Sequence, residues 1–235
     1  MRALCTTLLA LLAHDVRADS VLDDALNPLP QHSYVRLEPS YTLPADTTDV
    51  QVRAAFVERG WSGSADSVLG VRADVSLGHA AGTIGLGKVG LLGVAGITWP
   101  HGSIGAGLGA ALPTATSATF GADDLQLGPA AYGYLAAIEH VPMYLITQTL
   151  FATGDSPAIE TILEPSLAVQ LGDAALLSNA SIEIDWLAHD ARVPVNLRIG
   201  YALDQHWYVE AGPAVVVAGS ATGDVTLDAE IDYFL

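Results

Sequence analysis

The chain has 235 residues, of which 51% are hydrophobic and 15% charged, and its 9 basic and 26 acidic residues give a net charge of −17. Disordered acidic chains are poor in apolar residues, so this composition excludes disorder. Nucleic-acid binding requires a basic surface, so no nucleic-acid partner is expected.

Residues 1–18 have the features of a secretory signal peptide. Arg2 supplies the positive charge, residues 3–13 form an uncharged run too short to span a bilayer as a helix, and Ala18 ends the segment at a small residue. The alternative is a buried N-terminal helix. Cleavage removes Cys5, the only cysteine, and leaves a net charge of −18. Residues 19–31 are then expected to form a periplasmic N-terminal segment.

The longest charge-free stretch, residues 89–122, does not have the composition of a membrane helix. It contains Pro100, Pro113 and many glycines, and each glycine costs a helix about 1 kcal/mol and each proline about 3 kcal/mol. Short strands broken by turns are therefore expected here. The glycine-rich run at 82–90 has no phosphate-loop spacing, and we interpret it as a loop.

Alternation of polar and apolar residues is the dominant pattern of the chain. In the last segment Asp224, Thr226 and Asp228 alternate with Val225 and Leu227, which is the period of a strand and not of a helix. Turn residues divide the chain into twelve expected strands. They cover residues 32–43, 48–59, 67–78, 87–99, 102–112, 124–137, 141–152, 158–171, 174–186, 191–202, 205–218 and 224–235.

A soluble β-sandwich or small barrel and a membrane β-barrel both fit this pattern, and the length of the strands distinguishes them. Sandwich strands average about five or six residues, whereas a tilted membrane strand needs about nine to eleven, and most of the expected segments are at least that long. We therefore predict an all-β protein, an antiparallel transmembrane β-barrel of about twelve strands over residues 32–235, in the bacterial outer membrane. Outer-membrane lipid surrounds such a barrel. A soluble secreted β-barrel or sandwich with an apolar ligand is the alternative.

Two short motifs resemble a known family. Residues 110–116 (AALPTAT) followed by 124–129 (DLQLGP) resemble a strand end, loop and strand of a bacterial outer-membrane β-barrel transporter family named for the meta-pathway of phenol degradation, and 151–155 (FATGD) resembles its next strand end. The resemblance implies an outer-membrane channel or transporter for passive uptake. Its small-molecule permeants would be small hydrophobic or aromatic compounds.

The last strand also resembles the signal that the barrel-assembly machinery recognises. Apolar residues alternate through Ile231, Tyr233 and Leu235, but the final residue is Leu, and Phe234 is displaced by one position. Phe234 is therefore expected to face the lumen. The resemblance implies the assembly machinery as a partner.

The polar faces of the strands predict a charged lumen, with the last strand closing against the first so that Asp228 and Glu230 approach Arg36. One interpretation is a charged constriction that selects permeants. The other is a salt-bridged, plugged barrel with a structural role, because charges in an interior of low dielectric must be paired. The predicted lumen residues are Arg36, Glu38, Arg53, Arg72, Asp74, Glu160, Glu164, Arg198, Glu210, Asp228 and Glu230.

The sequence offers no clear catalytic, metal or cofactor site. His189 and Asp190 form an isolated pair in an expected turn. Asp228, Glu230 and Asp232 share one strand face, but a metal site needs ligands clustered at suitable spacing. We therefore expect no enzymatic activity, no metal and no cofactor.

Overall fold

The computed structural model of the protein describes residues 19–27, 32–43, 47–80, 82–117, 120, 124–138, 140–152, 154 and 157–235. The predicted signal peptide lies outside the described residues. Among the described residues, no helix has the length and apolar character needed to span a membrane.

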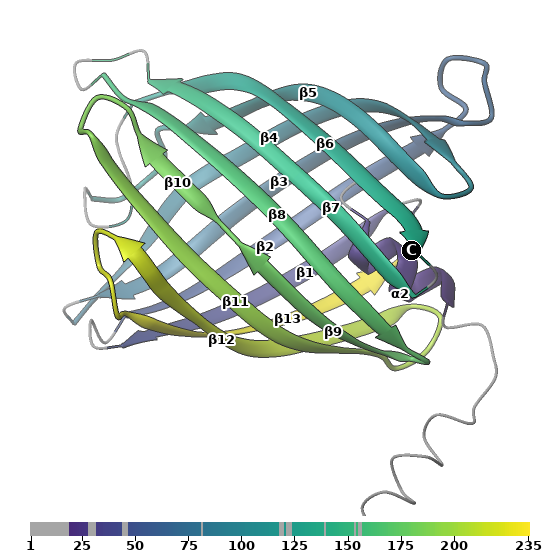
Figure 1. Ribbon diagram of the computed structural model, residues 1–235. Coiled ribbons are helices and arrows are strands. Elements are labelled where there is room, and N and C mark those ends of the chain that lie inside the picture. The colour runs from purple at the N-terminus through teal and green to yellow at the C-terminus, as the bar shows by residue number, and fades with distance from the viewer. Residues whose placement is uncertain are drawn as a thin grey trace, which may run out of the picture.

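A single antiparallel sheet accounts for nearly all of the described chain, and a short helix precedes it (Figure 1). The predicted all-β fold is confirmed. The elements are α2 Asp19–Leu26, β1 Tyr34–Leu43, β2 Thr47–Arg59, β3 Ser67–Ala80, β4 Thr83–Trp99, β5 Gly102–Leu112, β6 Gln126–Ile138, β7 Val141–Ala152, β8 Ile159–Leu171, β9 Ala174–Ala180, β10 Ile182–Asp185, β11 Asp190–Ala202, β12 Trp207–Gly219 and β13 Val225–Phe234.

The sheet closes into a barrel because its first and last strands pair. Tyr34 of β1 lies opposite Phe234 of β13, and the antiparallel register continues to Leu43 opposite Val225. Every strand in the sheet has a partner on each side, so the backbone hydrogen-bonding groups are satisfied within the wall, as a membrane-spanning sheet requires.

The strands β9 and β10 share one position in the wall, so the barrel has twelve strand positions, as predicted. Both pair with β8 and with β11 in one continuous register. The interruption falls at Ser181, whose register partner on β11 is Pro194. Proline has no N–H to donate, so only the bond from the Ser181 N–H to the Pro194 carbonyl remains, at 2.9 Å.

The two faces of the wall differ in chemistry. Apolar side chains on the outer face are exposed, with Leu108 at 72%, Ile199 at 68% and Phe56 at 63%. Charged residues alternate with such positions and point to the inside, where Asp232 is completely buried and Glu230 is 4% exposed. This is the reverse of a soluble domain and matches a barrel whose outer surface contacts lipid.

The strand β4 begins earlier than the sequence predicted. Residues 82–90 were expected to form a loop and the strand to begin at 87, but β4 extends from Thr83 to Trp99. Its first part pairs with β3 beyond a register shift between Val75 and Leu77. Glycine gives this segment little alternation, and the missing periodicity is the physical reason that the loop prediction was wrong.

The segment after β5 continues along β4 and then turns toward the inside of the barrel. The Thr114 hydroxyl accepts a hydrogen bond from the Val89 N–H at 2.8 Å, and the Thr116 N–H donates to the Leu86 carbonyl at 2.9 Å. The ring of Phe120 then occupies the space that a Cβ at Gly85 would need.

The helix α2 lies at one end of the barrel, beside the C-terminus (Figure 1). We call this the helix end. It includes α2, the turns at 60–66, 172–173 and 203–206, and Leu235; the opposite, loop end includes residues 113–117, 186–189 and 220–224. On α2, Val21, Leu22 and Leu26 are at most 3% exposed. They form one apolar cluster with Tyr34, Ala168, Ala175, Ala202, Tyr208 and Phe234.

Candidate functional site

The middle of the lumen contains a cavity of about 310 Å³, which we call the central cavity. Residues from most of the strands line it, and Ala25 of α2 contributes from the helix end. One part of the lining is ionic and is made by Arg36, Glu38, Arg53, Arg72, Glu164, Arg198, Glu210 and Glu230. The remainder combines aromatic and aliphatic side chains with three amides: Tyr132, Tyr144, Ile146, Ile162, Leu177, Gln148, Asn179 and Asn196.

Arg36 joins the two strands that close the barrel. Its Nε and Nη2 donate to the two carboxylate oxygens of Asp232 at 2.6 and 2.8 Å, and Nη2 also lies 2.8 Å from Glu230 Oε1. The bidentate geometry follows from the register, which places Arg36 directly opposite Asp232. Asp232 lies on the predicted lumen face of the last strand, with Asp228 and Glu230, and it is completely buried.

Arg198 forms a second ionic centre on β11. It donates to Glu210 Oε1 at 2.7 Å and to Asp228 Oδ2 at 3.3 Å. Its Nη1 lies 3.8 Å from Glu230 Oε2, so Glu230 connects the Arg36 and Arg198 centres. The hydroxyl of Tyr208, a completely buried residue, donates to the other Glu210 oxygen at 2.8 Å.

Glu38 adds a third arginine to this network. Its carboxylate lies 3.6 Å from Arg36 Nη1 and 3.3 Å from Arg53 Nη2, and Arg53 also donates to Gln51 at 3.0 Å. Among the described residues, the connected network therefore has three arginines and five carboxylates, a formal charge of −2.

The other predicted lumen residues lie outside that network. Arg72 and Asp74 form their own pair at 3.4 Å on β3, and Glu164 accepts a hydrogen bond from Ser181 at 3.3 Å. Glu160 lines a separate cavity at the loop end. Asp228 was expected near Arg36, but it lies opposite Ser40 in the register and pairs with Arg198. The structure thus brings seven of the eleven predicted residues into one ionic network.

Sequence reasoning missed the contribution of α2. Its apolar residues recur at Val21, Leu22, Ala25 and Leu26, which is helical spacing. That pattern was available in the sequence, but the segment is short. It packs against β1, which follows it in the chain, and against the distant strands β8, β9, β11, β12 and β13, which only closure of the barrel brings beside β1.

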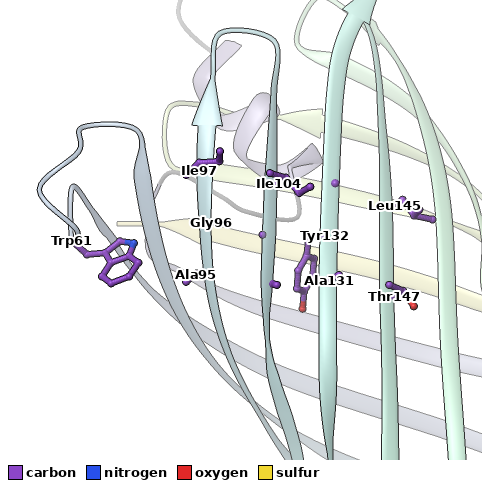
Figure 2. A pocket seen from close by; sticks show the side chains of 12 residues that line it. Trp61, Ala95, Gly96, Ile97, Ile104, Ala131, Tyr132, Leu145 and Thr147 are labelled. Carbon is purple, nitrogen blue, oxygen red and sulfur yellow. The ribbon is translucent and has the colours of Figure 1, made fainter.

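A cavity larger than the central one lies on the outer surface and not in the lumen (Figure 2). It is a groove of about 630 Å³ across β4 to β7. Ile97, Ile104 and Leu145 border it and are between 44% and 55% exposed, as lipid-facing side chains are. Small residues such as Ala95, Ala106 and Ala131 form its floor. This groove contains no charged residue.

The described residues contain no group of three or more His, Cys, Asp or Glu side chains placed to hold a metal ion. His189 and Asp190 lie in and next to the turn between β10 and β11, both exposed. Asp228, Glu230 and Asp232 each contact an arginine and are part of the ionic network.

Solved outer-membrane barrels of very different sequence share this fold. An outer membrane channel from Pseudomonas putida F1 is 10% identical, with 89% of this chain and 98% of that chain covered and a TM-score of 0.69. The NanC porin is 7% identical, with 86% and 100% covered and a TM-score of 0.65. Outer membrane phospholipase A from Escherichia coli is 12% identical, with 93% and 98% covered and a TM-score of 0.54.

No protein-family model and no curated protein matches the chain. At such low identity the structural likeness shows the fold alone, and the fold serves both channels and an enzyme. The closed barrel with its apolar outer surface belongs in the bacterial outer membrane, as the sequence predicted.

Proposed function

We propose that the protein is a passive outer-membrane channel for small hydrophobic or aromatic compounds. The observation that supports this best is the central cavity, where aromatic and aliphatic side chains face an ionic network inside a closed barrel. The solved barrels described as a porin and as an outer membrane channel support the channel assignment. The family resemblance of the 110–129 region supports the substrate class. Lipid around the barrel and insertion by the assembly machinery follow from the same proposal.

Permeation through the purified barrel tests the proposal. Liposomes with lipopolysaccharide in the outer leaflet, which slows the passage of hydrophobic solutes, are expected to admit benzyl alcohol faster with the folded protein than without it. The same liposomes are expected to exclude glucose, because the cavity is narrow and its ionic groups are already paired. Equal rates with and without protein contradict the channel.

A plugged structural barrel is the second candidate, and two observations favour it. The arginines in the lumen are held by carboxylates, and α2 packs against the wall at the helix end. Single-channel recording in a planar bilayer separates the two functions. A folded barrel that never gives a discrete current, even after removal of α2, supports the structural role.

A further inference from the structure

The central cavity contains a buried hydrogen-bond acceptor that the protein does not satisfy. Asn196 on β11 is only 9% exposed, and its Oδ1 has no hydrogen-bond partner among the described residues. Most buried polar atoms in proteins are paired, and an unpaired one costs free energy. A ligand with a donor group recovers that cost at this position.

Two residues of the same lining carry buried donors that are unpaired among the described residues. Arg198 lies two residues from Asn196 on the same face of β11, and Arg53 projects from β2. Their terminal nitrogens hold carboxylates, but the Nε–H group of each has no hydrogen-bond partner among the described residues. A group that both donates and accepts fits this combination, and a hydroxyl is the smallest such group.

The charge of the lining argues against an ionic ligand. Four arginines and four glutamates face the cavity, and Asp228 and Asp232 hold two of these arginines from beside it. A carboxylate or an ammonium ion loses its hydration on entering, and the arginines and three of the four glutamates are already paired with protein groups. An uncharged molecule has no such penalty.

The apolar part of the lining accommodates a carbon skeleton. Ile146, Ile162 and Leu177 come from three consecutive strands, and Tyr132 lies beside them. At about 310 Å³ the cavity is at the small end of ligand sites. It therefore suits a molecule of one ring or a short chain.

We propose that the central cavity binds a small uncharged alcohol. Its hydroxyl donates to Asn196 Oδ1 and accepts from an arginine Nε–H, and its carbon body packs on Ile146, Ile162 and Leu177. The inference rests on the proposed channel function only in treating this alcohol as a permeant.

A series of cyclohexyl compounds with one body and different polar groups tests the inference. The probes are cyclohexanol, cyclohexanone, cyclohexylammonium and cyclohexanecarboxylate, measured by equilibrium dialysis against the folded barrel in lipid nanodiscs, with empty nanodiscs subtracted. Cyclohexanol is expected to bind about 3- to 10-fold more tightly than cyclohexanone, because the ketone cannot donate to Asn196. Both ions are expected to bind more weakly still. Equal binding of alcohol and ketone, or tighter binding of either ion, overturns the inference.

Asn196→Leu removes the acceptor at nearly constant volume. In this variant the affinity for cyclohexanol is expected to fall to that for cyclohexanone, while the ketone affinity stays unchanged. Thr226→Val is the matched control, because it also removes a lumen-facing polar group but lies outside the cavity, hydrogen-bonded to Thr42; its preference for the alcohol is expected to persist. The probe series on the unaltered chain decides the inference even if Asn196→Leu does not fold.

Liposome permeation separates this inference from the channel proposal. If cyclohexanol binds with the stated preference but crosses no faster than in protein-free liposomes, the channel proposal fails and the binding site stands. If solutes cross but the barrel shows no preference for the alcohol, the binding site fails and the channel stands.

Discussion

At the residue scale, Glu230 is the link between the two ionic centres of the lumen. It lies 2.8 Å from Arg36 and 3.8 Å from Arg198 and is almost completely buried. The strand period was enough to predict that Arg36, Arg198 and Glu230 face the lumen. The partner of each charge depends on the register across the closing strands, which alternation alone does not determine, and Asp228 was for that reason assigned to the wrong arginine.

Removal of the Asp232 carboxylate tests the ionic link between β1 and β13. Asp232→Asn leaves Arg36 without its bidentate partner in a buried site, so we expect the free energy of unfolding to fall by about 3 kcal/mol or more. Urea unfolding of the barrel in lipid vesicles measures this. Asp224→Asn, in the turn before β13, is the control and is expected to change stability little.

Neutralising two arginines tests the lumen as an ion path. Arg36→Gln with Arg53→Gln removes two of the three positive charges of the network, so cation preference is expected to increase. Reversal potentials across a planar bilayer under a salt gradient measure the preference. Arg59→Gln, at the end of β2 and exposed, serves as the control. An unchanged reversal potential in the double variant contradicts a role of these charges in selectivity.

At the scale of elements, α2 packs its apolar residues against the wall at the helix end. The apolar cluster that contains α2 also includes Tyr34 of β1, Phe234 of β13 and Tyr208 of β12. The ring centroids of Tyr34 and Phe234 lie 5.7 Å apart. The inward position of Phe234 was predicted from the alternation of the last strand, and the structure confirms it. The helix itself was not predicted, because the residues that it contacts are brought together only by closure.

Disturbing α2 is expected to raise conductance. Leu22 is 2% exposed, so Leu22→Asp places a carboxylate in the apolar cluster between α2 and the wall. This favours release of the helix. Single-channel recording is expected to show a larger or more frequent current, and deletion of residues 19–26 is expected to have the same effect. Unaltered currents in both variants contradict a role of α2 in closing the lumen.

The packing of the Phe120 ring on Gly85 connects the segment after β5 to the wall. Gly85→Val places side-chain atoms where the Phe120 ring lies, and overpacking of this kind costs about 1–3 kcal/mol. Chymotrypsin is therefore expected to cleave after Phe120 roughly tenfold faster, as measured by mass spectrometry. Gly70→Val, where a Cβ has no neighbour within 4 Å among the described residues, is the matched control. Equal cleavage rates in the two variants contradict this packing.

At the scale of the whole molecule, the low charged fraction of the chain is the average of two unlike surfaces. The outer face exposes Leu108 and Ile199, while Asp232 and Glu230 are enclosed. The sequence was sufficient to predict the barrel and its number of strand positions, because lipid outside and ions inside impose opposite chemistry on alternate residues. The sequence was not sufficient to predict the strand in residues 82–90, because the glycines there remove the alternation of polar and apolar side chains.

The outer surface predicts how the folded protein behaves outside a membrane. The barrel is expected to be monodisperse in detergent and to migrate faster in a gel before heating than after it, because its hydrogen-bonded wall resists unfolding. Without detergent, the exposed apolar belt is expected to cause aggregation. Light scattering and gel migration check both expectations. A monodisperse chain in plain buffer contradicts the assignment to a membrane.

The interruption at Ser181 has a mechanical consequence for the wall. Strands pulled from a barrel by an atomic force tip separate as their ladders of hydrogen bonds break, and an intact ladder shares the load along its length. Here the ladder between β9–β10 and β11 lacks the bond that Pro194 cannot donate. Under load, the short β10 section is expected to detach first, so that this hairpin ruptures in two force steps.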